Sequence, residues 1–246
     1  QCMEPVQRRH SDAGTASLVT KLHLPGTDPR ALRERLRVAA RCPELLSPLS
    51  TEPEAVGDRW LTRWPRIEMV AQDPIGLPWA QAGALLARLH REPLDGFAVA
   101  HGAPARLARG VDRLDRGAVA GVIRRAAERL RFPVGPVTLA HGDFHLGQLG
   151  RDAGRHVLID IDDLGVGDPR WDLARPAGFW AAGMVPDGDW QAFVRGYRQA
   201  GGPALLNTHF DSWSRFICRE GQNRFEAFDF ESLRWLQLHI HNAAGT

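Results

Sequence analysis

Alternating apolar and polar residues predict short β-strands in the first quarter of the chain, at residues 6–9, 17–24 and 58–63. In the second of these segments, the alternation places Lys21 on the same face as Val19 and His23. The leucines of that segment lie on the opposite face. This part of the chain is therefore expected to be rich in short strands.

A helix is predicted between the second and third strands. Pro25-Gly26 ends the strand, and Asp28 followed by Pro29 is typical of a helix N-terminus, with Asp28 as the N-cap. Apolar residues then recur at helical spacing to about Arg41.

The remaining pattern is mostly helical. Helical spacing predicts helices over 78–90 and 116–130, and the chain is helical again after Asp172. Short apolar strands at 137–140 and 156–161 interrupt it, with loops rich in His, Gly and Asp between them. We therefore expect an α+β protein with a β-rich lobe at 1–65 and a larger, mainly helical lobe at 66–246.

Composition and charge exclude several classes of protein. The chain has 246 residues, of which 43% are hydrophobic and 24% are charged, as in ordinary globular proteins. Its net charge of +2 gives no reason to expect nucleic acid or an anionic membrane as a partner. No apolar run approaches membrane-spanning length, and the first ten residues lack the apolar core of a signal peptide. Three widely spaced cysteines form no disulfide or zinc pattern, which favours the reducing cytoplasm.

Lys21 is the only lysine among 31 basic residues. A lone lysine on a strand is usually a solvated side chain. In a chain that otherwise uses arginine throughout, however, it is a candidate for a task that needs a compact point charge.

The polar loops contain the candidate chemistry. They read His-Gly-Asp-Phe-His-Leu-Gly-Gln from His141, Leu-Ile-Asp-Ile-Asp-Asp from Leu158, and Gly-Asp-Pro-Arg-Trp-Asp-Leu-Ala from Gly167. A carboxylate directly after a strand can accept a proton from a hydroxyl. A second carboxylate with an amide oxygen offers the hard ligands that suit Mg²⁺. Together with a lysine for the phosphates, this is the set that phosphoryl transfer needs.

These motifs resemble the aminoglycoside phosphotransferase and choline kinase-like family, whose fold is related to the protein kinases. The clear match spans about 139–174, and a weaker one lies at 85–93, where Leu-Leu-Ala-Arg-Leu-His-Arg-Glu-Pro is similar to the Leu-His helix of the family. The resemblance implies a protein-kinase-like two-lobe fold with a reduced β-rich N-terminal lobe. It also implies Mg²⁺ and ATP or GTP as cofactors, with a small hydroxyl compound as the acceptor.

The resemblance assigns a role to each matching residue. Asp143 would be the catalytic base, and Gln148 and Asp160 would bind Mg²⁺, with Gln148 at a position where the family more often has Asn. Lys21 would hold the nucleotide phosphates, and Glu34 would fix Lys21 through an ion pair.

Other residues of the matching motifs would support the site. Asp168 and Asp172 would hydrogen-bond the catalytic loop, and His141 would hold that loop through backbone carbonyls. The segment 60–65 would lie beside the adenine.

Three interpretations remain open at this point. The first is a phosphotransferase for an aminoglycoside, sugar, amino alcohol or related natural product. Between Asp172 and Thr246, eight acidic residues balance seven arginines, which argues weakly for an acceptor less cationic than an aminoglycoside. The second is a pseudokinase that keeps the fold for ligand binding or regulation, an idea motivated by the 20 residues that precede Lys21.

The third is a metal-dependent hydrolase built on His141, Asp143 and His145. Asp162 and Asp163 add charge beside Asp160 and could bind a second metal or a cationic substrate group.

Overall fold

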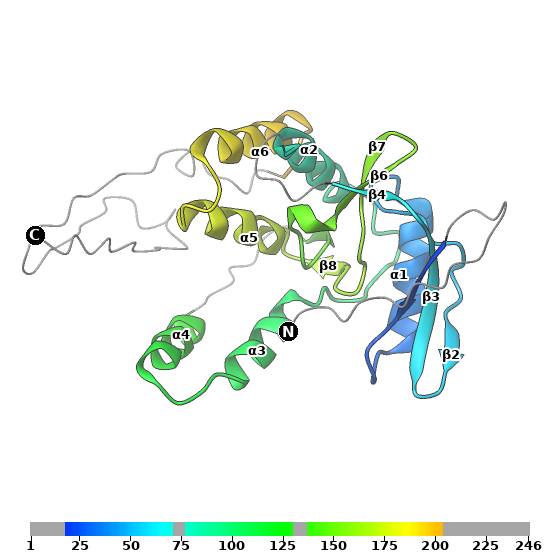
Figure 1. Ribbon diagram of the computed structural model, residues 1–246, viewed down its shortest axis with the longest axis horizontal. Coiled ribbons are helices and arrows are strands. Elements are labelled where there is room, and N and C mark those ends of the chain that lie inside the picture. Colours follow the sequence, from blue (N-terminus) through cyan, green and yellow to red (C-terminus); the bar gives the residue numbers. More distant parts are fainter. Residues whose placement is uncertain (1–17, 71–76, 130–136, 204–246) are drawn as a thin grey trace, which may run out of the picture.

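The computed structural model describes residues 18–70, 77–129 and 137–203 (Figure 1). Within these ranges, short antiparallel strands form small sheets and α-helices pack around them. The elements in chain order are β1 (Leu18–Leu22), α1 (Pro29–Arg41), β2 (Glu54–Val56), β3 (Arg59–Pro65), β4 (Glu68–Met69), α2 (Trp79–Leu89), α3 (Ala103–Asp112), α4 (Ala118–Arg129), β5 (Thr138–Ala140), the 3-10 helix η1 (Leu146–Gln148), β6 (Leu149–Asp152), β7 (Arg155–Leu158), β8 (Gly165–Gly167), α5 (Arg170–Ala181) and α6 (Asp187–Gln199). Among the described helices, none combines the length and the apolar character needed to cross a bilayer.

The N-terminal sheet has the order β1-β3-β2, and α1 packs beside it (Figure 1). The register places Lys21 opposite Thr62. Helix α1 begins as predicted, because the carboxylate of Asp28 accepts a hydrogen bond from the amide of Arg30 at 2.9 Å. Its buried face carries Leu32 and Leu36, which are almost fully removed from solvent.

The two faces of β1 are used in an unusual way. The leucines point outward, and Leu18 and Leu22 are 51% and 42% exposed. The opposite face carries Lys21 and is continued by His23, which directly follows the strand and is only 2% exposed. The polar face of this strand is therefore turned toward the interior, where its side chains find charged partners.

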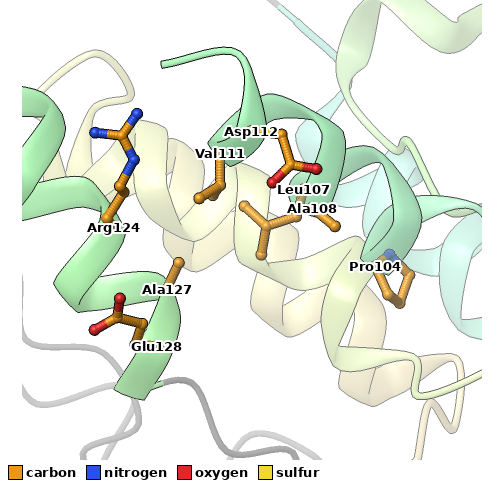
Figure 2. A pocket seen from close by; sticks show the side chains of 8 residues that line it. All are labelled: Pro104, Leu107, Ala108, Val111, Asp112, Arg124, Ala127 and Glu128. Atoms are coloured by element: carbon orange, nitrogen blue, oxygen red, sulfur yellow. The ribbon is translucent and has the colours of Figure 1, made fainter. Parts of the chain in front are cut away.

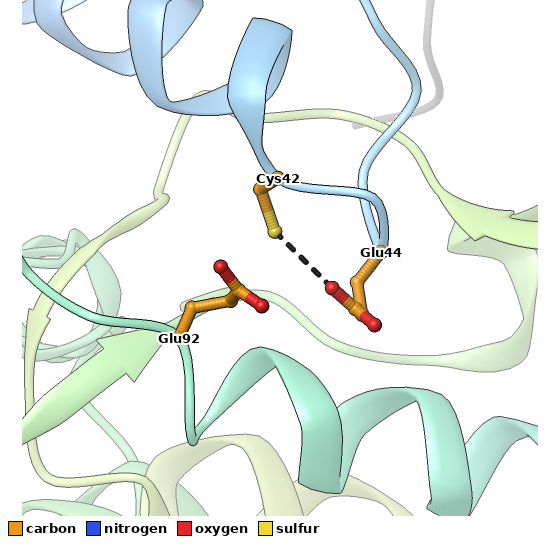
Figure 3. A group of neighbouring side chains, drawn as sticks. All are labelled: Cys42, Glu44 and Glu92. Atoms are coloured by element: carbon orange, nitrogen blue, oxygen red, sulfur yellow. Dashed lines mark hydrogen bonds between the residues drawn. The ribbon is translucent and has the colours of Figure 1, made fainter.

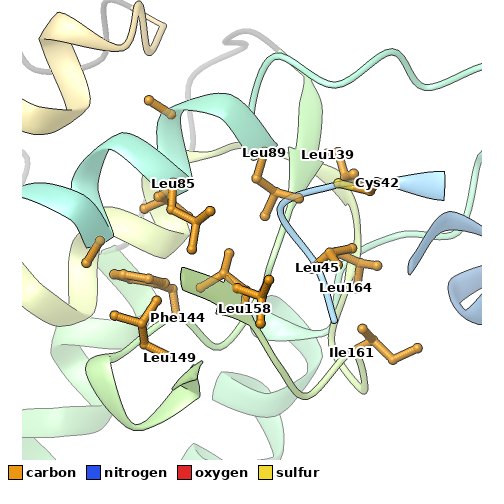
Figure 4. Close-up of a cluster of buried hydrophobic side chains, with 14 of the residues drawn as sticks. Cys42, Leu45, Leu85, Leu89, Leu139, Phe144, Leu149, Leu158, Ile161 and Leu164 are labelled. Carbon is orange, nitrogen blue, oxygen red and sulfur yellow. The ribbon is translucent and has the colours of Figure 1, made fainter. Parts of the chain in front are cut away.

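The chain after α1 joins a second sheet, whose order is β4-β6-β7. Leu45 forms a parallel bridge with Leu158 at the end of β7, and the amide of Leu46 donates to the carbonyl of Leu158 at 2.8 Å. Figure 4 shows Leu45 near Leu158, and Cys42 belongs to the same cluster, as does Leu85 of α2. Residues before and after position 65 therefore belong to one apolar core. The division of the chain into two lobes at residue 65 stays a prediction.

Helices α2 and α6 pack closely against each other. A Cβ atom added to Gly83 of α2 would lie 2.1 Å from the carbonyl oxygen of Phe193. One added to Gly196 of α6 would lie 2.0 Å from the carbonyl oxygen of Ala80. Glycine at both positions is needed because the two backbones approach more closely than any side chain allows.

Most of the predicted elements within the described ranges are confirmed, with limited differences at their ends. The strand predicted over 156–161 ends at Leu158, where the chain turns into the acidic loop. Helix α3 was not predicted, because Gly102 and Pro104 at its start resemble a turn. The predicted strand at 6–9 lies outside the described residues.

Candidate active site

The loop after β5 presents Asp143, and it is held by buried hydrogen bonds. Asp172 of α5 accepts from the backbone amide of His141 at 2.6 Å and from that of Gly142 at 2.7 Å. Gly142 has φ +81°, and a Cβ there would lie 2.2 Å from the carbonyl oxygen of Asp163. The Gly of the His-Gly-Asp motif is thus required by both backbone conformation and space.

Asp172 is completely buried and also contacts α2. Its Oδ2 lies 3.0 Å from Nε2 of His90, whose Nδ1 lies 2.7 Å from the hydroxyl of Tyr197. Burial alone would raise the pKa of Asp172, but the hydrogen bond from His90 and the amide of His141 lower it below its usual value. The predicted support role of Asp172 therefore has a structural basis, and His90 connects the Leu-His helix to the same network.

Asp168, in contrast, does not hold the loop of Asp143. Its carboxylate accepts from the amide and from Nε of Arg170, two residues later in the chain. The predicted contact with the loop is wrong, because these local contacts with Arg170 engage the side chain at the start of α5.

The loop that contains Asp160 is tied to the first loop. Nε2 of His141 lies 2.8 Å from the carbonyl oxygen of Ile159, as expected for a histidine that holds backbone. The amide of Ile159 donates to the carbonyl of Gln148 at 2.9 Å. Asp160 follows directly with φ +63°, in the left-handed region that few non-glycine residues adopt and in which Asp is enriched. Gln148, which is buried, and Asp160 are therefore brought to neighbouring backbone positions.

Lys21 reaches this acidic loop from β1. Its Nζ lies 2.7 Å from Oδ1 of Asp160 and 2.9 Å from Oδ1 of Asp162. Burial alone would lower the pKa of Lys21, but the charges of Asp160 and Asp162 raise it. The structure thus brings together the predicted phosphate lysine and a predicted metal ligand.

The predicted ion pair between Lys21 and Glu34 is wrong. Glu34 accepts instead from Nη1 of Arg37 at 2.8 Å, on the exposed side of α1. The buried stripe of α1 contains Leu32, Leu36 and Ala39, and position 35 lies nearest to this stripe. Arg35 accordingly points inward and donates to the carbonyl of Leu164 at 2.7 Å, whereas Glu34 lies on the flank.

Two arginines that sequence reasoning did not select contact the carboxylate of Asp143. Arg175 of α5 donates to Oδ1 at 2.6 Å, and Arg106 of α3 lies 3.0 Å from Oδ2. Arg106 also pairs with Asp163 and donates to the carbonyl of Gly142 at 2.6 Å. Arg175 directly follows the Asp-Leu-Ala motif, so the sequence offered a reason to consider it as a site residue. No motif marks Arg106, which lies in a segment that was not expected to be helical.

The arrangement of histidines does not favour a metal site at Asp143. Nδ1 of His141 accepts from the amide of Asp143 at 3.4 Å, and Nδ1 of His145 accepts from the amide of Gly147 at 3.1 Å. Both rings therefore serve the backbone of the loop. Within the described ranges, the only group of His, Cys, Asp and Glu ligand atoms close enough to hold one ion lies elsewhere.

That group consists of Cys42, Glu44 and Glu92 (Figure 3). The Cys42 thiol lies 3.6 Å from Glu44, which also accepts from Nε of Arg88 at 3.1 Å. Burial, with smaller contributions from neighbouring carboxylates, raises the pKa of Cys42 to about 12, so this thiol is protonated at neutral pH. Burial and the nearby Glu44 also raise the pKa of Glu92.

A depression of about 540 Å³ lies between α3 and α4 (Figure 2). None of the predicted site residues lines it. The lining residues are Pro104, Leu107, Ala108, Val111, Asp112, Arg124, Ala127 and Glu128.

Comparisons with known proteins agree with the fold and the motifs. The family model described as the phosphotransferase enzyme family matches residues 7–214. No curated protein matches the sequence.

Several solved structures are similar in fold. The macrolide 2'-phosphotransferase of Brachybacterium faecium is 21% identical, with a TM-score of 0.51 over 76% of this chain and 72% of that one. An aminoglycoside-3'-phosphotransferase of type VIII is 19% identical, with a TM-score of 0.56 over 78% and 81% of the two chains. An amicoumacin kinase in complex with AMP-PNP and Ca²⁺ is 15% identical, with a TM-score of 0.57 over 75% of this chain and 66% of that one.

These likenesses confirm the expected protein-kinase-like α+β fold. The family model covers most of the chain and agrees with the ordered motifs around Asp143 and Asp160. The chain therefore belongs to the phosphotransferase enzyme family.

Proposed function

We propose that this protein transfers the γ-phosphoryl group of ATP or GTP to a hydroxyl group of a small molecule. The observation that carries the proposal is the contact between Lys21 and Asp160, on a loop that His141 ties to the loop of Asp143. Phosphoryl transfer needs a phosphate-binding cation, a metal-binding carboxylate and a base within one site. Membership in the phosphotransferase enzyme family supports the same reaction class.

Asp160 and Gln148 are the proposed Mg²⁺ ligands. Both offer oxygen donors, and the hydrogen bond between Ile159 and Gln148 keeps their backbone positions adjacent. Carboxylate and amide oxygens suit this hard cation, so the residues fit the metal. Bound Mg²⁺ would neutralise charge on the phosphates. Lys21 would bind the phosphates themselves, as the resemblance implies.

Asp143 is the proposed base. Arg175 and Arg106 each contact a different oxygen of its carboxylate. Because each carboxylate oxygen has two lone pairs, an acceptor hydroxyl can donate to Asp143 without displacing either arginine. The two guanidinium groups would then fix the orientation of the carboxylate while it accepts the proton.

The acceptor class follows from chemistry near Asp143. Two arginines beside the base disfavour ammonium groups at that position, which supports an acceptor whose reacting hydroxyl is remote from amines. Two of the proteins with a similar fold are named as a macrolide and an aminoglycoside phosphotransferase. These names support a natural product of that general kind as the acceptor. A resistance role would follow only from an antibiotic acceptor.

A direct test incubates the purified protein with Mg²⁺, ATP or GTP, and a panel of hydroxyl compounds. We expect nucleoside diphosphate release that depends on one acceptor class, with the phosphorylated product detected by mass spectrometry. Asp143→Asn is expected to lower the rate by about 10²–10⁴-fold, because the base is lost. Asp189→Asn, a change of an acidic residue in the first turn of α6 and outside the proposed site, is the matched control. Product formation that is undiminished in Asp143→Asn would exclude this mechanism.

The second candidate is ligand binding without transfer. It is favoured by the outward position of Glu34 and by the two arginines on Asp143. Nucleotide binding without any phosphorylated product across the panel would support it.

A further inference from the structure

With Glu34 turned outward, Lys21 needs another anion to hold it in place, and Asp162 occupies that position. Oδ1 of Asp162 lies 2.9 Å from Nζ of Lys21 and 3.1 Å from Nδ1 of His23. Lys21 of β1 and His23, which directly follows the strand, are two residues apart, so their side chains lie on one side and a single carboxylate oxygen contacts both. Asp162 is therefore attached to the strand at two points.

The attachment continues into the sheet. His23 is 2% exposed, and its Nε2 lies 3.0 Å from Oγ1 of Thr62 on β3. The same hydroxyl oxygen accepts from Nε1 of Trp64 at 2.9 Å. Since Thr62 and Trp64 are buried, this chain of hydrogen bonds is rigid, and it fixes the position of the Asp162 carboxylate.

Asp160 cannot serve Lys21 in the same way. Its carboxylate is the proposed metal ligand, so its charge is shared with the cation when nucleotide is bound. Asp163 is also engaged elsewhere, by Arg106 of α3. Arg35 faces the acidic loop from α1 but is a cation, so it offers Lys21 no support. Two described carboxylates contact Lys21, those of Asp160 and Asp162. Of these, only Asp160 is a proposed Mg²⁺ ligand, so Asp162 remains available to hold Lys21.

We propose that Asp162, tethered by His23, is the positioning residue that holds Lys21 in line with the nucleotide phosphates. From the acidic loop, it performs the task that the family resemblance implied for Glu34. This inference rests on the proposed function, because it assumes that Lys21 binds phosphate.

The test measures binding, not turnover. The affinity for the Mg²⁺ complex of a non-hydrolysable ATP analogue is determined by calorimetry for the wild type and for Asp162→Asn, Asp162→Ala, Glu34→Gln and Lys21→Met. Loss of a charged hydrogen bond to Lys21 is expected to weaken binding about 10-fold or more in both Asp162 variants. Glu34→Gln is the matched control, because it neutralises an acidic residue that pairs with Arg37 and not with Lys21. This variant is expected to bind the nucleotide within about twofold of the wild type.

A double-mutant cycle separates positioning from direct metal binding. In the Lys21→Met background, Asp162→Asn is expected to have no further effect on nucleotide affinity. If the two effects add, or if Asp162→Asn raises the Mg²⁺ concentration needed for binding in both backgrounds, Asp162 acts on the metal and the proposal is overturned. His23→Gln provides a variant that leaves Asp162 intact, and it is expected to weaken binding only when Lys21 is present.

Failure of the proposed function gives a different pattern. If the wild type does not bind the nucleotide, or if Lys21→Met binds as tightly as the wild type, the nucleotide site itself is misassigned. If Lys21→Met weakens binding while the Asp162 and His23 variants do not, the nucleotide site stands and the positioning role of Asp162 is refuted. Thermal unfolding of each variant shows whether a lost affinity reflects a lost fold.

Discussion

Asp172→Asn perturbs the network that anchors the loop of Asp143 while changing almost no volume. In the wild type, three N–H groups point at one buried carboxylate, from the backbone of His141, the backbone of Gly142 and the ring of His90. An asparagine keeps one acceptor oxygen and replaces the other with an NH₂ group. If the oxygen retains the contacts of Oδ2, the amide of Gly142 then faces another donor.

The magnitude follows from these contacts. Hydrogen bonds to a charged group contribute about 1.5–3 kcal/mol, and a buried donor left without a partner costs about 1–3 kcal/mol. We therefore expect Asp172→Asn to lower the free energy of unfolding by about 2–4 kcal/mol. For a chain of this length, that corresponds to a decrease in Tm of about 4–16 °C. The rate of phosphoryl transfer should also decrease, because the backbone that carries Asp143 loses an anchor.

The loss should depend on pH. The pKa of Asp172 is lowered in the folded protein, against the effect of burial, by its partners. Its contribution is thus fully present above the ordinary Asp pKa of about 3.9 and disappears as the pH falls through the lower folded value. The difference in Tm between wild type and Asp172→Asn should therefore be constant near neutral pH and become smaller in acid.

Thermal and urea unfolding of both proteins provide the assay. Asp187→Asn is the matched control, since Asp187 is exposed and its one described acceptor contact, to Nε1 of Trp180 at 2.9 Å, can be kept by an amide oxygen. That variant should differ from the wild type by less than about 0.5 kcal/mol. Equal stability of Asp172→Asn and Asp187→Asn would show that the buried carboxylate does not anchor the loop.

Two further predictions concern packing and the single lysine. Gly83→Ala should destabilise the protein by about 1–3 kcal/mol, because the added methyl group overlaps the carbonyl of Phe193. Gly110 lies on an exposed part of α3, and a Cβ added there would meet no atom of another element within 4 Å. Gly110→Ala should therefore stabilise the protein by up to about 1 kcal/mol, and urea unfolding of both variants checks the contrast. Bound Mg²⁺-nucleotide should slow the acylation of Lys21 by an amine-specific reagent, which peptide mass mapping follows at the only lysine of the chain. Equal modification with and without nucleotide would contradict phosphate binding by Lys21.

The parts of the fold that the sequence predicts well are those set by local chemistry. Asp28 and Pro29 specify the start of α1, and apolar spacing specifies α2, whatever the tertiary context. The motif loops are equally local, since Gly142 is required for the conformation of the loop that carries Asp143. Family resemblance then selects Lys21 and Asp160, which the structure places in contact.

The features that could not be predicted depend on how elements are rotated and placed relative to one another. Glu34 and Arg35 are adjacent in sequence, but a rotation of about 100° about the helix axis decides which one faces the site. Residue spacing alone could not decide it, because both are charged. Arg106 reaches Asp143 from 37 positions away, through a helix whose start resembles a turn. The sequence left several roles open for Asp162, and its contact with His23 became visible only in the structure.

The ion pairs of Lys21 with both Asp160 and Asp162 have a consequence for the kind of ligand that the proposed site would favour. If Asp160 binds a cation as proposed, Lys21 would keep Asp162 as a partner. If instead a phosphate without a cation were to draw Lys21 away, both carboxylates would lose the ammonium group that neutralises them. Under the proposed function, two carboxylates around one lysine would therefore favour the metal–nucleotide complex over the free nucleotide.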